Sequence, residues 1–308
     1  MASSAPTTTA PAAGAPAVER TLGQWIVLGF ALFSMYVIWG STYIAIKFGL
    51  EGFPPFLLIG IRFYVAGSVL FVALLLGGAK LPRPVEWCNV TLVGFLMLTL
   101  GSGGLALAQL TVSSGLAAIA FATIPLWTAL FSGLLINWAG RGEWLALGVG
   151  LLGIVLLNLD GEFRSSPLGM SAILLGSAGW GLGTVLQVRL RMPPGFMVTA
   201  VQMLTSGITC IAIGLWQSEL IAIYPSPRAL GALIYLIVGP SMIAYSCHRY
   251  LVMNLRPVVA NSFAYTNPVI AVNLGVLLGG ETFSPYGIGA LGVVMVSLYL
   301  LSRSRARE

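Results

Sequence analysis

One block of about 140 residues occurs twice along this chain, and this duplication limits the folds that it can adopt. The spacing Gly-x-Gly-x-x-Gly stands in two apolar runs, LGVGLLGIVLL and YGIGALGVVMV, which lie as far apart as several other pairs. The matching pairs are Gly148 with Gly287, Trp39-Gly40 with Trp180-Gly181, Gly67 with Gly207, and Thr123-Ile124-Pro125 with Thr266-Asn267-Pro268. The repeat predicts two similar structural units, each formed by one half of the chain.

The composition indicates that lipid surrounds these units. Hydrophobic residues make up 57% of the 308 residues and charged residues only 8%, with a mean hydropathy of +0.94. A water-soluble domain has about 25% charged residues, so this chain could not cover its surface in water. The sequence has no basic patches interleaved with aromatic residues, so we expect no nucleic-acid partner. Its three cysteines lack metal-ligand spacing, and we expect neither a metal nor another cofactor.

Ten apolar segments are long enough to form membrane spans, five in each repeat. Because five is an odd number, the second repeat should cross the membrane in the opposite sense from the first. The sequence therefore predicts an all-α membrane protein of ten transmembrane helices, arranged as two inverted five-helix repeats. The expected spans are 25–46, 56–77, 89–110, 115–137, 144–159, 169–188, 196–217, 229–250, 258–279 and 285–302.

The same spans divide the chain into four parts. Residues 1–20 begin with an Ala/Pro/Thr-rich stretch without periodicity and should form a disordered tail. The first repeat should occupy residues 21–160, the second residues 161–303, and a short tail residues 304–308.

The distribution of positive charge predicts how the spans are oriented. Of the 15 Lys and Arg residues, eleven fall on the side of the termini and three on the other side, while Arg62 lies within a span. Cytoplasmic loops carry the excess of Lys and Arg in membrane proteins. We therefore expect both termini in the cytoplasm.

Several features of the sequence occur together: ten spans, a five-plus-five repeat, the segment IWGSTYIAIKFG, Arg62 in the second span, and Thr-x-Pro in the fourth and ninth spans. This combination resembles the drug/metabolite transporter superfamily, in particular its ten-span EamA-type branch. This resemblance implies a transporter rather than an enzyme, in the inner membrane of a bacterium. It implies export of amino acids, including aromatic ones, or of related small metabolites by alternating access between the inverted repeats. We expect the chain to act as a monomer.

Six residues are candidates for contact with a substrate. Trp39 and Trp180 occupy equivalent positions at mid-span, where Trp is unusual because it prefers the membrane interface. Each belongs to a stripe along one helical face, and either core packing or the lining of a central cavity explains such a stripe. Polar residues on these faces either join helices or form hydrogen bonds with a substrate. The substrate-binding candidates are Trp39, Tyr43, Trp180, Thr184, Asn261 and Tyr265.

Three further residues are candidates for a hinge or a gate. Pro125 and Pro268 should kink the fourth and ninth spans, either as fixed bends or as hinges that move in opposite senses. Arg62 is the only charge well inside a span and should have a partner or a purpose. It either stabilises or gates the outer mouth, or it binds an anionic group of the substrate.

Two patterns suggest functions that the rest of the sequence does not support. The Gly-x-Gly-x-x-Gly runs match a dinucleotide fingerprint, but both lie inside spans, where small residues let helices pack closely.

A multidrug or metabolite efflux pump with proton coupling is the alternative function, and it usually needs a carboxylate within the membrane. All nine acidic residues lie in loops, terminal segments or span ends, so we expect facilitated or weakly coupled transport.

Reporter fusions test the predicted orientation. A fluorescent protein that folds only in the cytoplasm should be active at both ends of the chain, and a periplasmic phosphatase should be inactive at both. Opposite results for the two ends would contradict an even number of spans and the inverted repeat with it.

Overall fold

The computed structural model describes residues 21–136, 140–159, 166–221, 224–254 and 263–305, and these residues form helices joined by short connections. Within the described residues all ten expected spans are helical, and four of them contain more than one helix. The first repeat holds α1 (Leu22–Gly40) with α2 (Thr42–Gly49), α3 (Pro55–Leu76), α4 (Pro84–Gly94) with η1 (Phe95–Gly103) and α5 (Gly104–Ala108), α6 (Ser114–Phe121) with α7 (Ile124–Leu135), and α8 (Arg141–Leu159). The second holds α10 (Pro167–Arg189), α11 (Met197–Trp216), α12 (Pro227–Leu236) with η2 (Ile237–Ala244) and α13 (Tyr245–Asn254), α15 (Phe263–Gly279) and α16 (Pro285–Arg305).

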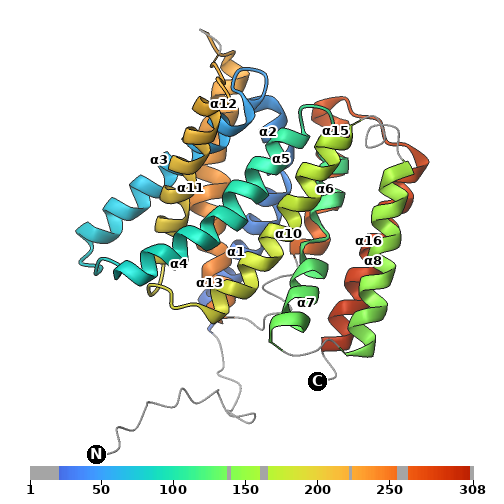
Figure 1. Ribbon diagram of the computed structural model, residues 1–308, viewed down its shortest axis with the longest axis horizontal. Helices are drawn as coiled ribbons and strands as arrows, with labels where there is room; N and C mark the ends of the chain where they lie inside the picture. The colour runs from blue at the N-terminus through green and yellow to red at the C-terminus, as the bar shows by residue number, and fades with distance from the viewer. Residues whose placement is uncertain (1–20, 137–139, 160–165, 222–223, 255–262, 306–308) are drawn as a thin grey trace, which may run out of the picture.

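The helices have the length and composition of membrane spans. Among the described residues, seven helical segments are long and apolar enough to cross a bilayer, and two further apolar helices are shorter. Helix α1 begins and α16 ends at the same end of the bundle (Figure 1), as an even number of crossings requires. The predicted fold class, an all-helical membrane protein with two repeats, is confirmed.

The helices pack in a pattern that is symmetric between the repeats. Helices α3 and α11 pack against each other, and so do α8 and α16, which lie side by side at one edge of the bundle (Figure 1). Each of these pairs joins equivalent spans. The first span, α1 and α2, packs on α12, η2, α13 and α15, whereas the sixth span, α10, packs on η1, α5 and α7. A two-fold axis between the repeats produces such an exchange of partners, which agrees with the inverted arrangement.

Glycines allow the closest of these contacts. A methyl group at Gly67 of α3 would lie 2.5 Å from the backbone nitrogen of Leu204 in α11. Gly207 of α11 meets the backbone of Tyr64 in α3 in the same way, with Cα 2.6 Å from the position of such a methyl group. Gly67 and Gly207 are a repeat pair, so the two contacts are equivalent. Without side chains at these positions the two helix backbones come into contact.

The glycine runs of α8 and α16 are only partly explained by packing. Methyl groups at Gly150 and Gly153 would lie 2.8 Å from Ser297 Oγ and Val294 Cγ2 of α16, so the predicted close packing is confirmed there. Positions Gly148, Gly289 and Gly292 have no atoms within 4 Å that a methyl group would meet, and the prediction is wrong for them. Gly289 and Gly292 therefore do not contribute to the contact between α16 and α8.

The sequence predicted that Pro125 kinks the helix of the fourth span, but Pro125 does not lie within a continuous helix. The fourth span is interrupted at Ala122 and Thr123, and Pro125 lies in the first turn of the helix that starts afterwards. A proline costs little there, because the first-turn N–H groups have no partner within the helix. Pro268, in contrast, lies inside α15. The two prolines of the repeat therefore occupy different local structures.

Two π-helical segments, η1 and η2, occur at equivalent places in the third and eighth spans. The sequence analysis did not predict them. The first contains the glycine run that starts at Gly101, and the second contains Pro240. Such segments are rare and frequently lie at functional sites.

The contact between α3 and α11 can be tested with one methyl group. Gly67→Ala should destabilise the protein by about 1–3 kcal/mol, because the added atom overlaps the backbone of α11. Gly289→Ala, in a helix position with free space, should leave stability unchanged or raise it slightly. Thermal unfolding of the purified proteins in detergent measures both effects. Equal unfolding temperatures for the two variants would contradict the backbone contact.

Candidate functional site

An aromatic cluster surrounds Trp39 near the end of α1. The ring of Trp39 lies 5.2 Å from that of Tyr245, 5.1 Å from His248 and 4.8 Å from Phe263, measured between ring centroids. Its indole nitrogen donates a hydrogen bond of 3.3 Å to the carbonyl oxygen of Pro240 in η2. Three spans, the first, eighth and ninth, thus contribute rings to one cluster, which we call the Trp39 cluster.

A second cluster surrounds Trp180 in the other half. The ring of Trp180 lies 5.7 Å from Phe121 at the end of α6, and Phe121 lies 6.4 Å from Tyr43 of α2. Gly101 of η1 leaves room for Trp180, since a methyl group there would lie 2.8 Å from its ring. This Trp180 cluster joins the sixth, third, fourth and first spans.

The two clusters correspond through the repeat. Phe121 and Phe263 are about 142 residues apart, and each packs edge-on against the Trp of the opposite half. The structure therefore gives Trp39 and Trp180 equivalent surroundings, but no ring contact joins them to each other among the described residues. Sequence analysis missed Phe121 and Phe263. The signal was an aromatic residue four or five positions before each repeated proline.

The other four substrate-binding candidates lie in different surroundings, and the structure describes the side chains of only two of them. Tyr43 is buried within the Trp180 cluster. The hydroxyl of Thr184 donates a 2.8 Å hydrogen bond to the carbonyl oxygen of Trp180, one turn earlier in the same helix. Asn261 lies outside the described residues, and so does the side chain of Tyr265, whose backbone belongs to α15. The substrate-binding roles of all these residues stay predictions.

Arg62 is buried between α3 and η2, with 3% of its surface exposed. Its Nε donates a 2.8 Å hydrogen bond to the hydroxyl of Ser241, which in turn donates to the carbonyl oxygen of Leu236 at 3.0 Å. The guanidinium carbon also lies 4.7 Å from the centroid of the Phe63 ring. The expected partner of Arg62 is therefore a neutral hydroxyl, and none of the ion pairs among the described residues involves it.

The carboxylate of Glu281 connects three spans. It lies near Lys47, at the end of α2 that is farther from Trp39. Glu281, between α15 and α16, accepts a 2.7 Å hydrogen bond from the ammonium group of Lys47. It also accepts from the backbone N–H groups of Ser114 and Gly115, at 2.8 and 3.1 Å, at the start of α6. Burial by itself raises the pKa of Glu281, but these hydrogen bonds outweigh it and hold the pKa below its usual value. Sequence analysis missed this link because its partners are far apart in the chain.

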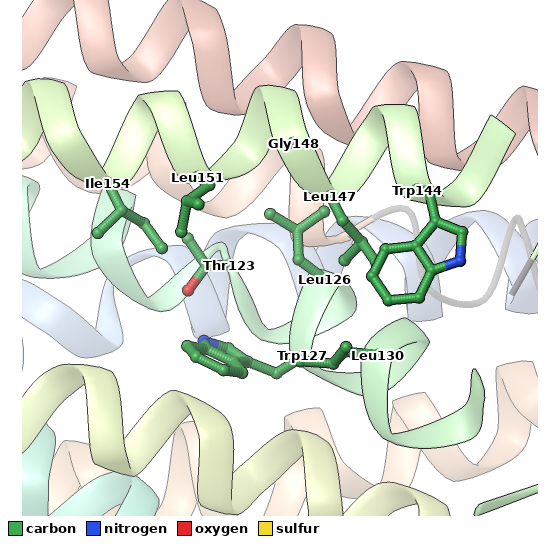
Figure 2. Close-up of a pocket in the computed structure, with 9 residues that line it drawn as sticks. All are labelled: Thr123, Leu126, Trp127, Leu130, Trp144, Leu147, Gly148, Leu151 and Ile154. Atoms are coloured by element: carbon green, nitrogen blue, oxygen red, sulfur yellow. The ribbon is translucent and has the colours of Figure 1, made fainter. Parts of the chain in front are cut away.

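A cavity of about 320 Å³ lies between α7 and α8. Figure 2 shows the Trp127 ring and Thr123 on one side and Leu151 and Ile154 of α8 on the other. Apart from Thr123, its lining is apolar or aromatic, and the hydroxyl of Thr123 donates to the carbonyl oxygen of Ala120 at 2.6 Å. Among the residues that the structure describes, none of the six substrate-binding candidates lines this cavity.

Comparison with known proteins identifies both halves of the chain. The sequence profile of the EamA-like transporter family matches residues 24–159 and again residues 167–303. The uncharacterized inner membrane transporter YedA of Escherichia coli strain K12 is 40% identical over 280 residues, which cover 91% of this chain and 92% of that protein. The uncharacterized transporter sll0355 of Synechocystis is 28% identical and covers 93% of both proteins.

A solved crystal structure has the same fold. It superposes with a TM-score of 0.64 at 21% sequence identity, covering 91% of this chain and 99% of that one.

The Glu281 link predicts a pH-dependent contribution to stability. Glu281→Gln should destabilise the protein by about 1.5–3 kcal/mol at pH 7, because it removes hydrogen bonds to a buried carboxylate. A lowered pKa means that the contribution is present above the usual value of 4.5 and is lost as the pH falls through the lower value of the folded protein. The difference in unfolding temperature between wild type and variant should therefore shrink below about pH 4.5.

Glu51→Gln provides the control, because Glu51 forms a longer, exposed ion pair of 3.4 Å with Arg228. This variant should unfold like the wild type at every pH. A Glu281→Gln difference that stays constant down to pH 3 would show that the carboxylate charge contributes nothing.

Proposed function

This chain belongs to the EamA-like transporter family and is therefore an inner-membrane transporter, not an enzyme. On this basis we propose that it exports amino acids, including aromatic ones, and related small metabolites by alternating access. The observation that carries the proposal is the pair of equivalent aromatic clusters around Trp39 and Trp180. Flat aromatic surfaces favour substrates with an apolar or planar body. In each cluster a Trp of one repeat packs on spans of the other repeat, so both lie at the junction where the repeats would move.

Alternating access requires that the two halves rock against each other. The breaks in the helices near the clusters support such a motion. The first span is interrupted at Ser41, two residues after Trp39, and the fourth span is interrupted directly after Phe121. We propose that Pro125 and Pro268 act as hinges beside these clusters. The Lys47–Glu281 link joins the first, fourth and ninth spans and would hold the outer side closed until it breaks.

The positions of the acidic side chains support facilitated or weakly coupled transport. The described ones, Glu51, Glu86, Glu143, Glu219 and Glu281, lie in connections or at the first turns of helices. A proton relay needs a titratable group at depth in the membrane. We propose that substrate leaves down its own gradient across a bacterial inner membrane, with both termini in the cytoplasm. Since one chain contains both repeats, we expect a monomer to suffice.

Transport by the purified protein in liposomes tests this proposal. A panel of radiolabelled phenylalanine, tryptophan, leucine, glutamate and the cation tetraphenylphosphonium covers the two candidate functions. Exchange of phenylalanine or tryptophan without an imposed proton gradient is the expected result. Movement of tetraphenylphosphonium alone, dependent on a proton gradient, would replace amino-acid export by the proton-coupled efflux alternative.

Substitution of the two Trp residues tests the site. Trp39→Ala and Trp180→Ala should each lower the exchange rate about 10-fold, because each removes the central ring of a cluster. Trp216→Ala is the matched control, since Trp216 ends α11 with 84% of its surface exposed. Rates are compared at equal amounts of reconstituted protein. Wild-type rates for both cluster variants would mean that these rings do not line the substrate path.

A further inference from the structure

The guanidinium of Arg62 uses only part of its hydrogen-bonding capacity. It has five N–H donors, and a single hydrogen bond, from Nε to Ser241, is formed. Neither terminal nitrogen, Nη1 or Nη2, has an acceptor in the part of the chain that the structure describes. The terminal edge of the guanidinium therefore carries four donors without a partner among the described residues, although only 3% of the surface of Arg62 is exposed.

The repeat shows that packing does not require a charge at this place. The paired contacts of Gly67 with Leu204 and of Gly207 with Tyr64 align α3 with α11 at an offset of about 140 residues, which makes Gln202 the equivalent of Arg62. Gln202 is equally buried, and its amide donates a 2.7 Å hydrogen bond to the side chain of Gln187. The same position is thus neutral and paired in one repeat, but charged and mostly unpaired in the other.

The surroundings of Arg62 lead directly to the Trp39 cluster. Ser241, which holds Nε, follows Pro240, whose carbonyl oxygen holds the indole of Trp39. Tyr245 packs against Trp39 at 5.2 Å and begins α13, directly after η2. The π-helical segment η2 therefore brings a buried cation and an aromatic surface to one place.

We infer that Arg62 is the anion-binding residue of this transporter and that its substrates carry a carboxylate, which pairs with the Nη1 and Nη2 edge of the guanidinium. A carboxylate fits this edge because its two oxygens accept two parallel N–H donors. The inference rests on the proposed function and narrows it, since it names the group by which the substrate is recognised. The apolar body of the substrate would then lie against Trp39 and Tyr245.

The inference also explains why the buried charge lacks a carboxylate from the protein. A permanent ion pair would occupy the terminal edge and exclude the substrate. Ser241 orients the guanidinium through Nε alone and leaves that edge free. In a medium of low polarity the unpaired cation then favours an anionic ligand over a neutral one of the same shape.

Competition in liposomes tests the inference with wild-type protein. Exchange of radiolabelled phenylalanine is measured against 3-phenylpropionate, which keeps the carboxylate, and against phenylalaninamide and phenethylamine, which lack it. We expect 3-phenylpropionate to compete nearly as well as phenylalanine itself and the other two compounds to compete at least about 10-fold more weakly. Equal competition by phenethylamine would overturn the inference but would leave the proposed function intact.

Variants locate the effect at Arg62. Arg62→Gln introduces the residue that the other repeat tolerates, and it should weaken competition by 3-phenylpropionate at least about 10-fold while leaving phenethylamine unchanged. Arg62→Lys should restore part of the preference, because it keeps the charge and loses the two parallel donors. Arg228→Gln, which removes an exposed ion pair in the first turn of α12, is the control and should keep the wild-type preference. An unchanged preference in Arg62→Gln would overturn the inference.

A binding measurement separates this inference from the proposed function. In detergent, 3-phenylpropionate should raise the unfolding temperature of the wild type and of Arg228→Gln, but not that of Arg62→Gln. If this pattern appears and no amino acid of the panel is exchanged in liposomes, the anion site stands and the proposed export function fails. If the compound stabilises Arg62→Gln as much as the wild type, its carboxylate binds elsewhere and the inference fails.

Discussion

Direct contact between helix backbones is the constraint on which the rest of this structure depends. Lipid tails are as apolar as the side chains, so the hydrophobic effect does not drive helices together in a membrane. Helices there associate through close packing and hydrogen bonds. Here α3 and α11 meet at Gly67 and Gly207, and α10 meets η1 along a face that includes Gly176. Each contact joins the two repeats. The glycines therefore determine how closely the two halves approach and where their surfaces face each other.

Polar groups inside this packing are costly, and the two best-defined ones are satisfied in different ways. The Lys47–Glu281 link satisfies a buried carboxylate with an ammonium group and two backbone donors at the start of α6. It joins parts of both repeats at the end of three spans. Arg62 is different, because it lies deeper and is paired only through one nitrogen. The complete link stabilises one arrangement of the helices, whereas Arg62 keeps the donors that we propose bind a ligand.

Departures from regular helix gather around the aromatic clusters. The indole of Trp39 is held by a carbonyl group of η2, and Trp180 packs on Gly101 of η1. The interruptions of the first and fourth spans adjoin Trp39 and Phe121. Freed backbone groups in lipid are tolerated only where protein or a polar cavity satisfies them. The same irregularities thus adjoin the aromatic clusters that we propose as the substrate site.

The sequence by itself determined the ten helices, the duplication and the family, because hydropathy, turn residues and repeat spacing are properties of local segments. It also selected Trp39, Trp180 and Arg62, which stand out as unusual residues within apolar runs. Only the tertiary structure decided that the two Trp residues belong to separate clusters, that Phe121 and Phe263 complete them, and that Ser241 binds Arg62. These contacts join spans from different halves of the chain, and hydropathy carries no information about which helix faces meet. The π-helical segments and the start of a helix at Pro125 were hidden for the same reason, since they form where neighbouring helices satisfy the backbone.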